Sequence, residues 1–259
     1  MRIGSLFSGI GGLELGLERA GVGTVAWQCE ADPYCRRVLA KHWPGVPIFE
    51  DVRTLTDPPD CEVLCGGWPC QDISKAGKGA GLDGERSGLF FEFVRIVRMV
   101  RPQLVVMENV PALTVRGLGV VLGELARAGL DAQWGCLSAA GVGAPHLRRR
   151  IFIVAYPNDE PNKAVRRKRE AAANQGLGGR HPGIRGNGDA QRQESIGGPR
   201  QAVGCRPSPE PRSAHWESEP GVGRVADGVS SRVDRLRALG NAVVPQVAEY
   251  VGNRILAAR

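Results

Sequence analysis

The stretch 5-SLFSGIGGLELGL-17 decides how this chain begins to fold. Its apolar start extends the run from Arg2 and predicts a strand over 2–6, while Leu13, Leu17 and Ala20 recur at helical spacing after the glycines. A glycine-rich turn between a strand and a helix lets backbone N–H groups approach a ligand closely at the helix N-terminus. The same turn could also serve only as a tight connection, so by itself it leaves ligand binding open.

The rest of the first 156 residues repeats this alternation of short apolar runs and amphipathic stretches, which is typical of βα units. We expect strands over 2–6, 25–29, 62–65, 104–107 and 151–155. The helical spacing of Phe90, Phe93, Val94, Val97 and Val100 predicts a helix between two of them. The sequence therefore predicts an α/β fold with an open, mostly parallel sheet, and a last helix, marked by Val244, Val247, Ala248, Val251 and Ile255, that returns to it.

Length and composition limit the protein to one large domain with a smaller addition, because 259 residues at 42% hydrophobic content bury one substantial core. No apolar run is long enough to span a bilayer, and the first residues lack the apolar core of a signal peptide. The seven cysteines are scattered without paired spacing, which indicates reduced thiols. We therefore expect a soluble, cytoplasmic protein that is not secreted and has no membrane partner.

The positive charge is concentrated in one segment. Residues 163–212 hold eleven Lys or Arg against four Asp or Glu, which accounts for the whole net charge of +7. The segment contains no Phe, Tyr or Trp and fourteen Gly or Pro, so we expect a flexible, loop-rich insert. A polyanion such as nucleic acid is the partner this predicts, and a solvated charged loop is the alternative. The predicted divisions are 1–156, 157–215 and 216–259.

Several polar residues follow the predicted strands. Glu30 and Asp51 lie after the second strand and the third unit, where an acid often binds a nucleotide-type cofactor. Cys70, in 66-GGWPCQDIS-74, is interpreted as a nucleophile on a strand-exit loop, with a buried thiol as the alternative. A metal site with Cys61 and Cys65 is disfavoured, because the spacing is unusual and no histidine lies nearby, so no metal is expected.

Three later motifs complete the set of candidates. Glu108 comes directly after a buried strand, where desolvation raises a carboxyl pKa, although it could also be a helix cap. Arg148 and Arg150 alternate and are expected to point to the same side, or else they are strand-flanking solubilising residues. The stretch 240-GNAVVP-245 is interpreted as a turn into the last helix.

The ordered series FSGIGG, Glu30, Asp51, PCQ, ENV, Arg148 with Arg150, and GNAVVP resembles the C5-cytosine DNA methyltransferases. The resemblance covers about residues 1–156 and 216–259. It implies a Rossmann-like sheet that binds S-adenosylmethionine, releases S-adenosylhomocysteine and faces a small target-recognition region. The implied cofactor-binding residues are Phe7, Ser8, Gly9, Ile10, Gly11, Gly12, Glu30, Asp51, Val52, Pro69, Leu89, Asn241 and Ala242.

The resemblance also implies the catalytic residues Cys70, Glu108, Arg148 and Arg150. Cys70 would add to C6 of a flipped-out cytosine, Glu108 would neutralise the ring at N3, and the arginines would support the cytosine O2. The loop 74–88 would close over the base. Ser5 and His146 depart from the family, which usually has an acid and a glutamine at these two positions.

The expected substrate is double-stranded DNA, with the chain acting as a monomer of prokaryotic or phage origin beside a restriction endonuclease that could act separately. Two alternatives stay open: a transfer RNA cytosine-5 methyltransferase with the same catalytic set, and a non-catalytic nucleic-acid-binding relative. A nicotinamide-dependent dehydrogenase is set aside, because GIGG lacks the G-x-G-x-x-G register.

Overall fold

The computed structural model of the chain describes residues 1–69, 88–158 and 232–258. Cys70, nearly all of the predicted loop 74–88 and the basic segment 163–212 lie outside the described residues. The predicted divisions of the chain and the roles assigned to those segments therefore stay predictions.

Seven strands form one mixed sheet in the order β3-β2-β1-β4-β5-β7-β6. The strands are β1 (Arg2–Leu6), β2 (Thr24–Cys29), β3 (Ile48–Phe49), β4 (Val63–Gly66), β5 (Leu104–Asn109), β6 (Leu130–Leu137) and β7 (Arg150–Pro157). Neighbours from β3 to β5 pair in parallel, whereas β7 is antiparallel to both β5 and β6. The predicted α/β class with a mostly parallel sheet is confirmed.

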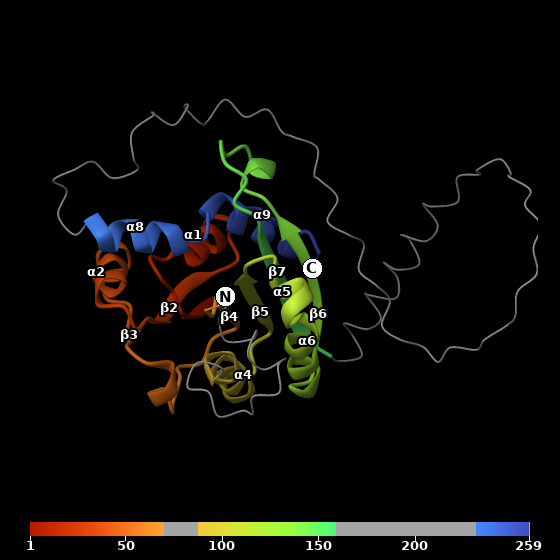
Figure 1. The fold of residues 1–259 in the computed structure, drawn as a ribbon. Helices are drawn as coiled ribbons and strands as arrows, with labels where there is room; N and C mark the ends of the chain where they lie inside the picture. The colour runs from red at the N-terminus through yellow and green to blue at the C-terminus, as the bar shows by residue number, and fades with distance from the viewer. Residues whose placement is uncertain (70–87, 159–231, 259) are drawn as a thin grey trace, which may run out of the picture. The chain divides into compact units, whose positions relative to one another are not determined.

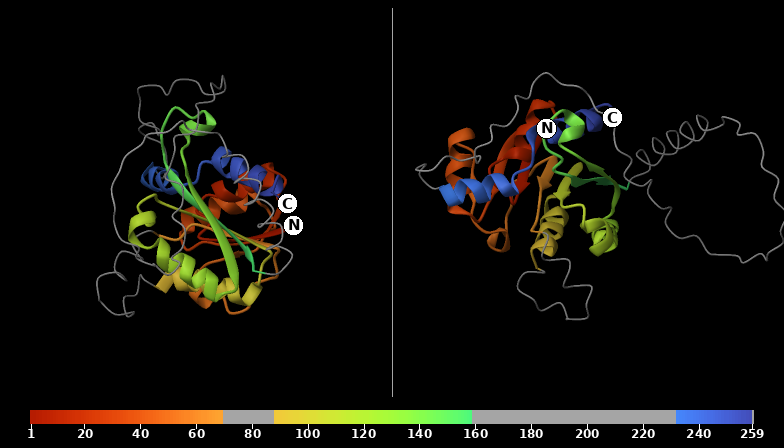
Figure 2. Two further views of the ribbon diagram at one scale, coloured as in Figure 1. Left: turned by 90° about the vertical axis from the view of Figure 1, so that its right-hand side faces the viewer. Right: turned by 45° about the horizontal axis from the view of Figure 1, so that its top comes forward.

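Helices cover both faces of this sheet (Figures 1 and 2). They are α1 (Gly12–Arg19), α2 (Pro33–His42), α4 (Gly88–Val100), α5 (Leu113–Arg116), α6 (Leu118–Arg127), α8 (Arg232–Asn241) and α9 (Pro245–Leu256), with short 3-10 turns η1 (Val52–Thr54) and η3 (Ala140–Val142). The α1 and α9 helices lie on one face, and α4 and α6 lie on the other.

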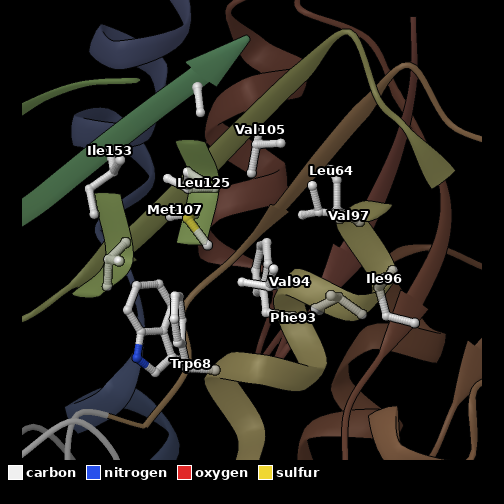
Figure 3. Close-up of a cluster of buried hydrophobic side chains, with 14 of the residues drawn as sticks. Leu64, Trp68, Phe93, Val94, Ile96, Val97, Val105, Met107, Leu125 and Ile153 are labelled. Carbon is white, nitrogen blue, oxygen red and sulfur yellow. The ribbon is translucent and has the colours of Figure 1, made fainter. Parts of the chain in front are cut away.

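Successive side chains of the central strands point alternately into two hydrophobic cores, one on each face of the sheet. Leu64 and Met107 point into the core beneath α4 and α6, whereas their neighbours Cys65 and Val106 join the core beneath α1 and α9. Figure 3 shows the first core, where Trp68, just after β4, meets Phe93 of α4. Because both faces are covered, β4 and the first four residues of β5 form near-continuous apolar runs, as is usual for parallel sheets.

The C-terminal helix packs on the first helix through small residues. A Cβ added at Gly16 would lie 2.4 Å from the Cβ of Ala248, and one at Gly252 would lie 2.6 Å from the Cβ of Ala20. The absent side chains therefore allow the two helix backbones to approach closely. This contact brings the segment before α9 beside the glycine-rich turn, across more than two hundred residues of sequence.

The five expected strands are all present, with ends that differ by up to two residues. Two further strands, β3 and β6, were not predicted. The β3 strand has only two residues, and β6 is an edge strand that alternates half-buried and exposed positions with weak hydrophobic contrast. The sequences of β3 and β6 therefore lack the strong apolar run on which strand prediction depends.

Candidate functional site

The carboxyl ends of the five parallel strands meet at one edge of the sheet. The glycine-rich turn follows β1, Glu30 follows β2, Asp51 lies just beyond β3, Pro69 follows β4 and Glu108 ends β5. Most of the residues that the sequence nominated are therefore gathered at this edge by topology alone.

The glycine-rich turn adopts a left-handed backbone that glycine favours. Gly9 and Gly11 have φ angles of 57° and 84°, and Phe7 has a φ of 56°, which is uncommon for a residue with a side chain. A Cβ added at Gly9 would meet no atom within 4 Å, so the backbone there is open on the side where a ligand could approach. The ring of Phe7 stacks on Phe93, with centroids 6.5 Å apart.

Glu30 ties the turn to the end of the second strand. Its carboxylate accepts hydrogen bonds from the Gly9 N–H at 2.7 Å and from the Asp32 N–H at 2.8 Å. Asp32 in turn caps α2 by accepting from the N–H groups of Tyr34 and Cys35, and it pairs with Arg237 of α8. Burial opposes ionisation of Asp32, but these amides and Arg237 lower its pKa.

Asp51 caps the short turn η1 and is paired with its neighbour. It accepts from the Arg53 backbone N–H at 2.9 Å, and its carboxylate lies 2.8 Å from the Arg53 guanidinium. The hydrogen bonds from Arg53 lower the pKa of Asp51. Arg95 of α4 holds the same segment by donating to the carbonyl oxygens of Val52 and Leu55. Sequence reasoning missed Arg53 and Arg95, because nothing in their spacing distinguishes them from surface arginines.

The GNAVVP segment, which contains the implied cofactor-binding residues Asn241 and Ala242, lies against the glycine-rich turn. A Cβ added at Gly12 would stand 2.2 Å from the carbonyl oxygen of Val243. Arg148 donates to the carbonyl oxygens of Gly240 and Ala242. Asn241 itself is exposed and Ala242 is half-buried. Among the other nominated residues, Leu89 packs against the same core as Phe7, and Pro69 is exposed.

Glu108 and Arg150 form a largely buried ion pair, with Arg150 Nε 2.8 Å from Glu108 Oε1. Burial raises the pKa of Glu108 to about 7, although Arg150 and Arg148 act in the opposite direction. Arg150 thus faces the acid directly, whereas Arg148 reaches the GNAVVP backbone. The two arginines, which their alternation predicted to point to the same side, therefore contact different partners.

The segment that leads into Cys70 is fixed against the same acid. Gly67 lies close to that acid, because an added Cβ would stand 2.7 Å from Glu108 Oε2 and would displace the carboxyl group. The side chain of Asn109 donates to the Trp68 carbonyl oxygen at 3.0 Å and accepts from the Val110 N–H at 2.8 Å. Asn109 was not predicted to be a site residue. Its position inside the ENV motif, next to Glu108, could have indicated it.

Four of the five cysteines within the described residues are buried and lack the properties of a reactive thiol. Cys29, Cys35, Cys61 and Cys65 are buried, and burial raises the pKa of each of them, to about 12 for Cys29 and Cys35 and to about 11 for Cys61. They are therefore neutral near pH 7 and poor nucleophiles. Residues 1–69, 88–158 and 232–258 contain no group of three or more His, Cys, Asp or Glu that could hold a metal ion. Over the same ranges, no helix is long and apolar enough to cross a membrane.

Comparison with known proteins connects this arrangement to one family. Residues 1–183 match the model of the C-5 cytosine-specific DNA methylases. A type II methyltransferase of Bacillus subtilis, M2.BsuMI, is 34% identical over 173 residues, which are 64% of this chain and 44% of the relative. M.NgoBI of Neisseria gonorrhoeae, also a type II methyltransferase, is 36% identical over 162 residues, which are 60% of this chain and 50% of that protein.

A solved structure agrees with these matches. The crystal structure of a putative DNA modification methyltransferase from an Escherichia coli prophage superposes with a TM-score of 0.51 at 27% identity, over 61% of this chain and 47% of that one. The chain spans about half the length of the curated relatives it matches. The family match over residues 1–183 covers all seven strands of the sheet.

Proposed function

Because the chain belongs to the C-5 cytosine-specific DNA methylase family, we propose that it transfers a methyl group from S-adenosylmethionine to C5 of cytosine in double-stranded DNA. The observation that carries the proposal is the buried Glu108 carboxyl, which lies against Gly67 at the start of the segment leading to Cys70. A proton donor in β5 and a nucleophile on the segment that follows the neighbouring strand β4 are the two groups that this reaction needs.

The edge of the sheet fits S-adenosylmethionine in the groups it presents. The open backbone at Gly9 allows a close approach, and Glu30 lies beside it with a carboxylate that suits ribose hydroxyls. Asp51 and Val52 would receive the adenine, whose stacking partner would be Phe7, and the segment with Asn241 would complete the site. When bound, the cofactor supplies an electrophilic methyl carbon on a sulfonium.

Cys70 would start the reaction as a thiolate that adds to C6 of cytosine. The C5–C6 π electrons move into the ring, N3 takes the proton of Glu108, and C5 becomes nucleophilic enough to accept the methyl group. Loss of the C5 proton to a base then restores the double bond and expels the thiolate, while the N3 proton returns to Glu108. A pKa near 7 suits Glu108 to this exchange, because both of its protonation states are populated at neutral pH.

Arg150 would stabilise the charge that develops during these steps. Its guanidinium lies against Glu108 and would reach the cytosine O2, while Arg148 would hold the GNAVVP segment through its carbonyl oxygens. Because C5 and C6 are inaccessible in a stacked duplex, the base must be flipped out. The basic residues of 163–212 would contact DNA phosphates. The proposed setting is the cytoplasm of a prokaryotic or phage-infected cell, with the protein acting as a monomer.

The first test is transfer of labelled methyl from S-adenosylmethionine to mixed-sequence duplex DNA, followed by bisulfite sequencing. We expect duplex label that disappears in Cys70→Ala and persists in Cys61→Ala, a cysteine at the opposite end of β4. Label on transfer RNA alone would move the activity to RNA. Absence of label on both substrates, with the cofactor bound, would leave a non-catalytic relative.

The covalent step has a test of its own. Fluorine at C5 cannot leave as a cation, so a duplex with 5-fluorocytosine at the target found by sequencing should trap the protein as a denaturant-resistant complex. The complex should form with the wild type and with Cys61→Ala, and not with Cys70→Ala. Methyl transfer without any trapped complex would contradict the proposed bond between Cys70 and C6.

A further inference from the structure

Three buried oxygen groups form a chain beneath the glycine-rich turn. The Ser5 hydroxyl, at the end of β1, lies 2.5 Å from Glu14 Oε1 in the first turn of α1. The Ser8 hydroxyl, within the turn, lies 2.9 Å from that of Ser5. The chain therefore runs from the core, across the strand, to the turn that is proposed to bind the cofactor.

Glu14 is an unusual residue to find at the start of this chain. It is 0% exposed, and no arginine, lysine or histidine within the described residues forms an ion pair with it. Burial raises its pKa, with Glu30 adding to the shift and Ser5 and Ser8 opposing it. A carboxyl group in such surroundings depends on the hydrogen bonds that it accepts, and the Ser5 hydroxyl supplies one at Glu14 Oε1.

The hydroxyl groups give the chain one direction. The Ser5 hydroxyl donates to Glu14 Oε1, and the Ser8 hydroxyl donates to Ser5 Oγ. Because the Ser8 hydrogen is used within the chain, the lone pairs of Ser8 Oγ are left to accept a hydrogen bond. Exposure increases along the chain toward the turn, since Ser5 and Glu14 are 0% exposed and Ser8 is 9% exposed.

Ser8 is also held through its backbone. Its N–H donates to the Cys29 carbonyl oxygen at 3.2 Å, and its carbonyl oxygen accepts from the Gly11 N–H at 2.9 Å. The residue after it, Gly9, donates to Glu30. With the side chain and both backbone groups bonded, the Ser8 hydroxyl has a defined orientation within the turn.

We propose that Glu14 is a positioning residue for cofactor binding, which accepts from Ser5 and through it orients the Ser8 hydroxyl, so that the Ser8 oxygen can accept from a donor group of bound S-adenosylmethionine. The inference rests on the proposed function, because that function names the cofactor. It gives a role to Glu14 and Ser5, which are not among the predicted catalytic or cofactor-binding residues.

The test compares four variants of the full chain by titration calorimetry with S-adenosylmethionine and S-adenosylhomocysteine. Glu14→Gln keeps a side-chain oxygen that can accept from Ser5, so its dissociation constants should stay within about threefold of the wild type. Glu14→Leu and Ser5→Ala break the chain and should weaken both ligands by roughly tenfold. The fourth variant, Val121→Ala, opens a cavity in the opposite core and should lower the melting temperature without changing either constant.

Steady-state kinetics separate positioning from a purely structural role. Glu14→Leu should raise KM for S-adenosylmethionine about tenfold while kcat at saturating cofactor stays close to the wild type. A leucine is well suited to a buried site, so the melting temperature of this variant should not fall in step with its affinity. Rescue by glutamine is the result that a packing role would not produce.

The outcomes distinguish this inference from the proposed function. Equal cofactor affinity in Glu14→Leu and the wild type would overturn the positioning role while methyl transfer stands, as would a Glu14→Gln variant as weak as the leucine. Affinity that depends on Glu14 in a protein that methylates neither DNA nor RNA would refute the proposed function and support the positioning role. A wild type that binds neither ligand would refute both.

Discussion

The guanidinium of Arg150 lies 2.8 Å from the Glu108 carboxyl, and yet the pKa of that acid is raised to about 7. Desolvation of a buried carboxyl therefore outweighs its attraction to a neighbouring cation. The pair places a group that can hold or release a proton near neutral pH at the edge of the sheet, beside the segment that leads to Cys70.

Removing the cation should leave the acid harder to ionise. In Arg150→Ala we expect the pKa of Glu108 to rise further, because Arg150 is the largest influence that lowers it. Methyl transfer should fall by roughly a hundredfold, as for the loss of one transition-state charge stabiliser. Single-turnover rates at saturating DNA provide the measurement. Arg149→Ala, which removes an exposed neighbour, should change that rate by less than about threefold.

Glu108 should also make folding stability depend on pH. Its pKa is about 7 in the folded protein and 4.5 in an unperturbed chain, so between these values the folded state holds the proton that the unfolded state has lost. The contribution of Glu108 to the free energy of unfolding is therefore fully present below pH 4.5 and is lost as pH rises through 7. The loss is about 3 kcal/mol.

Glu108→Gln removes this ionisation and should flatten that part of the profile. Urea unfolding at about pH 5 and about pH 8 should show a smaller difference between the two pH values for the variant than for the wild type. The same variant should transfer no methyl group. Parallel profiles for the two proteins would show that Glu108 is ionised without cost in the folded state.

Asn109 should matter for catalysis more than for cofactor binding. Asn109→Ala leaves the Trp68 carbonyl and the Val110 N–H without their partner, which should cost about 1–3 kcal/mol of unfolding free energy. Because the strand exit toward Cys70 is then less well placed, kcat should fall by roughly tenfold or more, with the dissociation constant of S-adenosylmethionine unchanged. Calorimetry and single-turnover kinetics check the two parts. Asn253→Ala, at an exposed position of α9, should alter neither.

Two helical glycines should respond in opposite directions to alanine. Gly12→Ala forces a Cβ to within 2.2 Å of the Val243 carbonyl oxygen, so we expect a loss of about 1–3 kcal/mol and weaker cofactor binding. Gly123 in α6 has no atom within 4 Å of an added Cβ, and its replacement should raise stability by up to about 1 kcal/mol. Thermal unfolding measures both changes. Equal effects of the two substitutions would mean that the backbone at Val243 moves away from the added Cβ without a loss of stability.

Local sequence patterns were sufficient for the central strands and the fold class. The apolar runs that became β1, β4 and β5 are buried on both faces, and such strands leave a strong signal. Helix α2 was missed because its polar residues leave only Cys35 and Leu39 buried. Helix α8 has a single buried residue, Ala238, so its hydrophobic pattern is equally faint.

Sequence by itself determined which side chains follow the strands, because βα alternation sends the carboxyl ends of parallel strands to a common edge. Glu30, Asp51 and Glu108 could be assigned to that edge on this ground alone. Only the tertiary structure decided how Arg150 joins them. It is the first residue of β7, which runs antiparallel to β5, so the start of one strand lies beside the end of the other. A reversed strand direction and the packing of Glu14 beneath the turn depend on contacts between distant segments, which no local pattern contains.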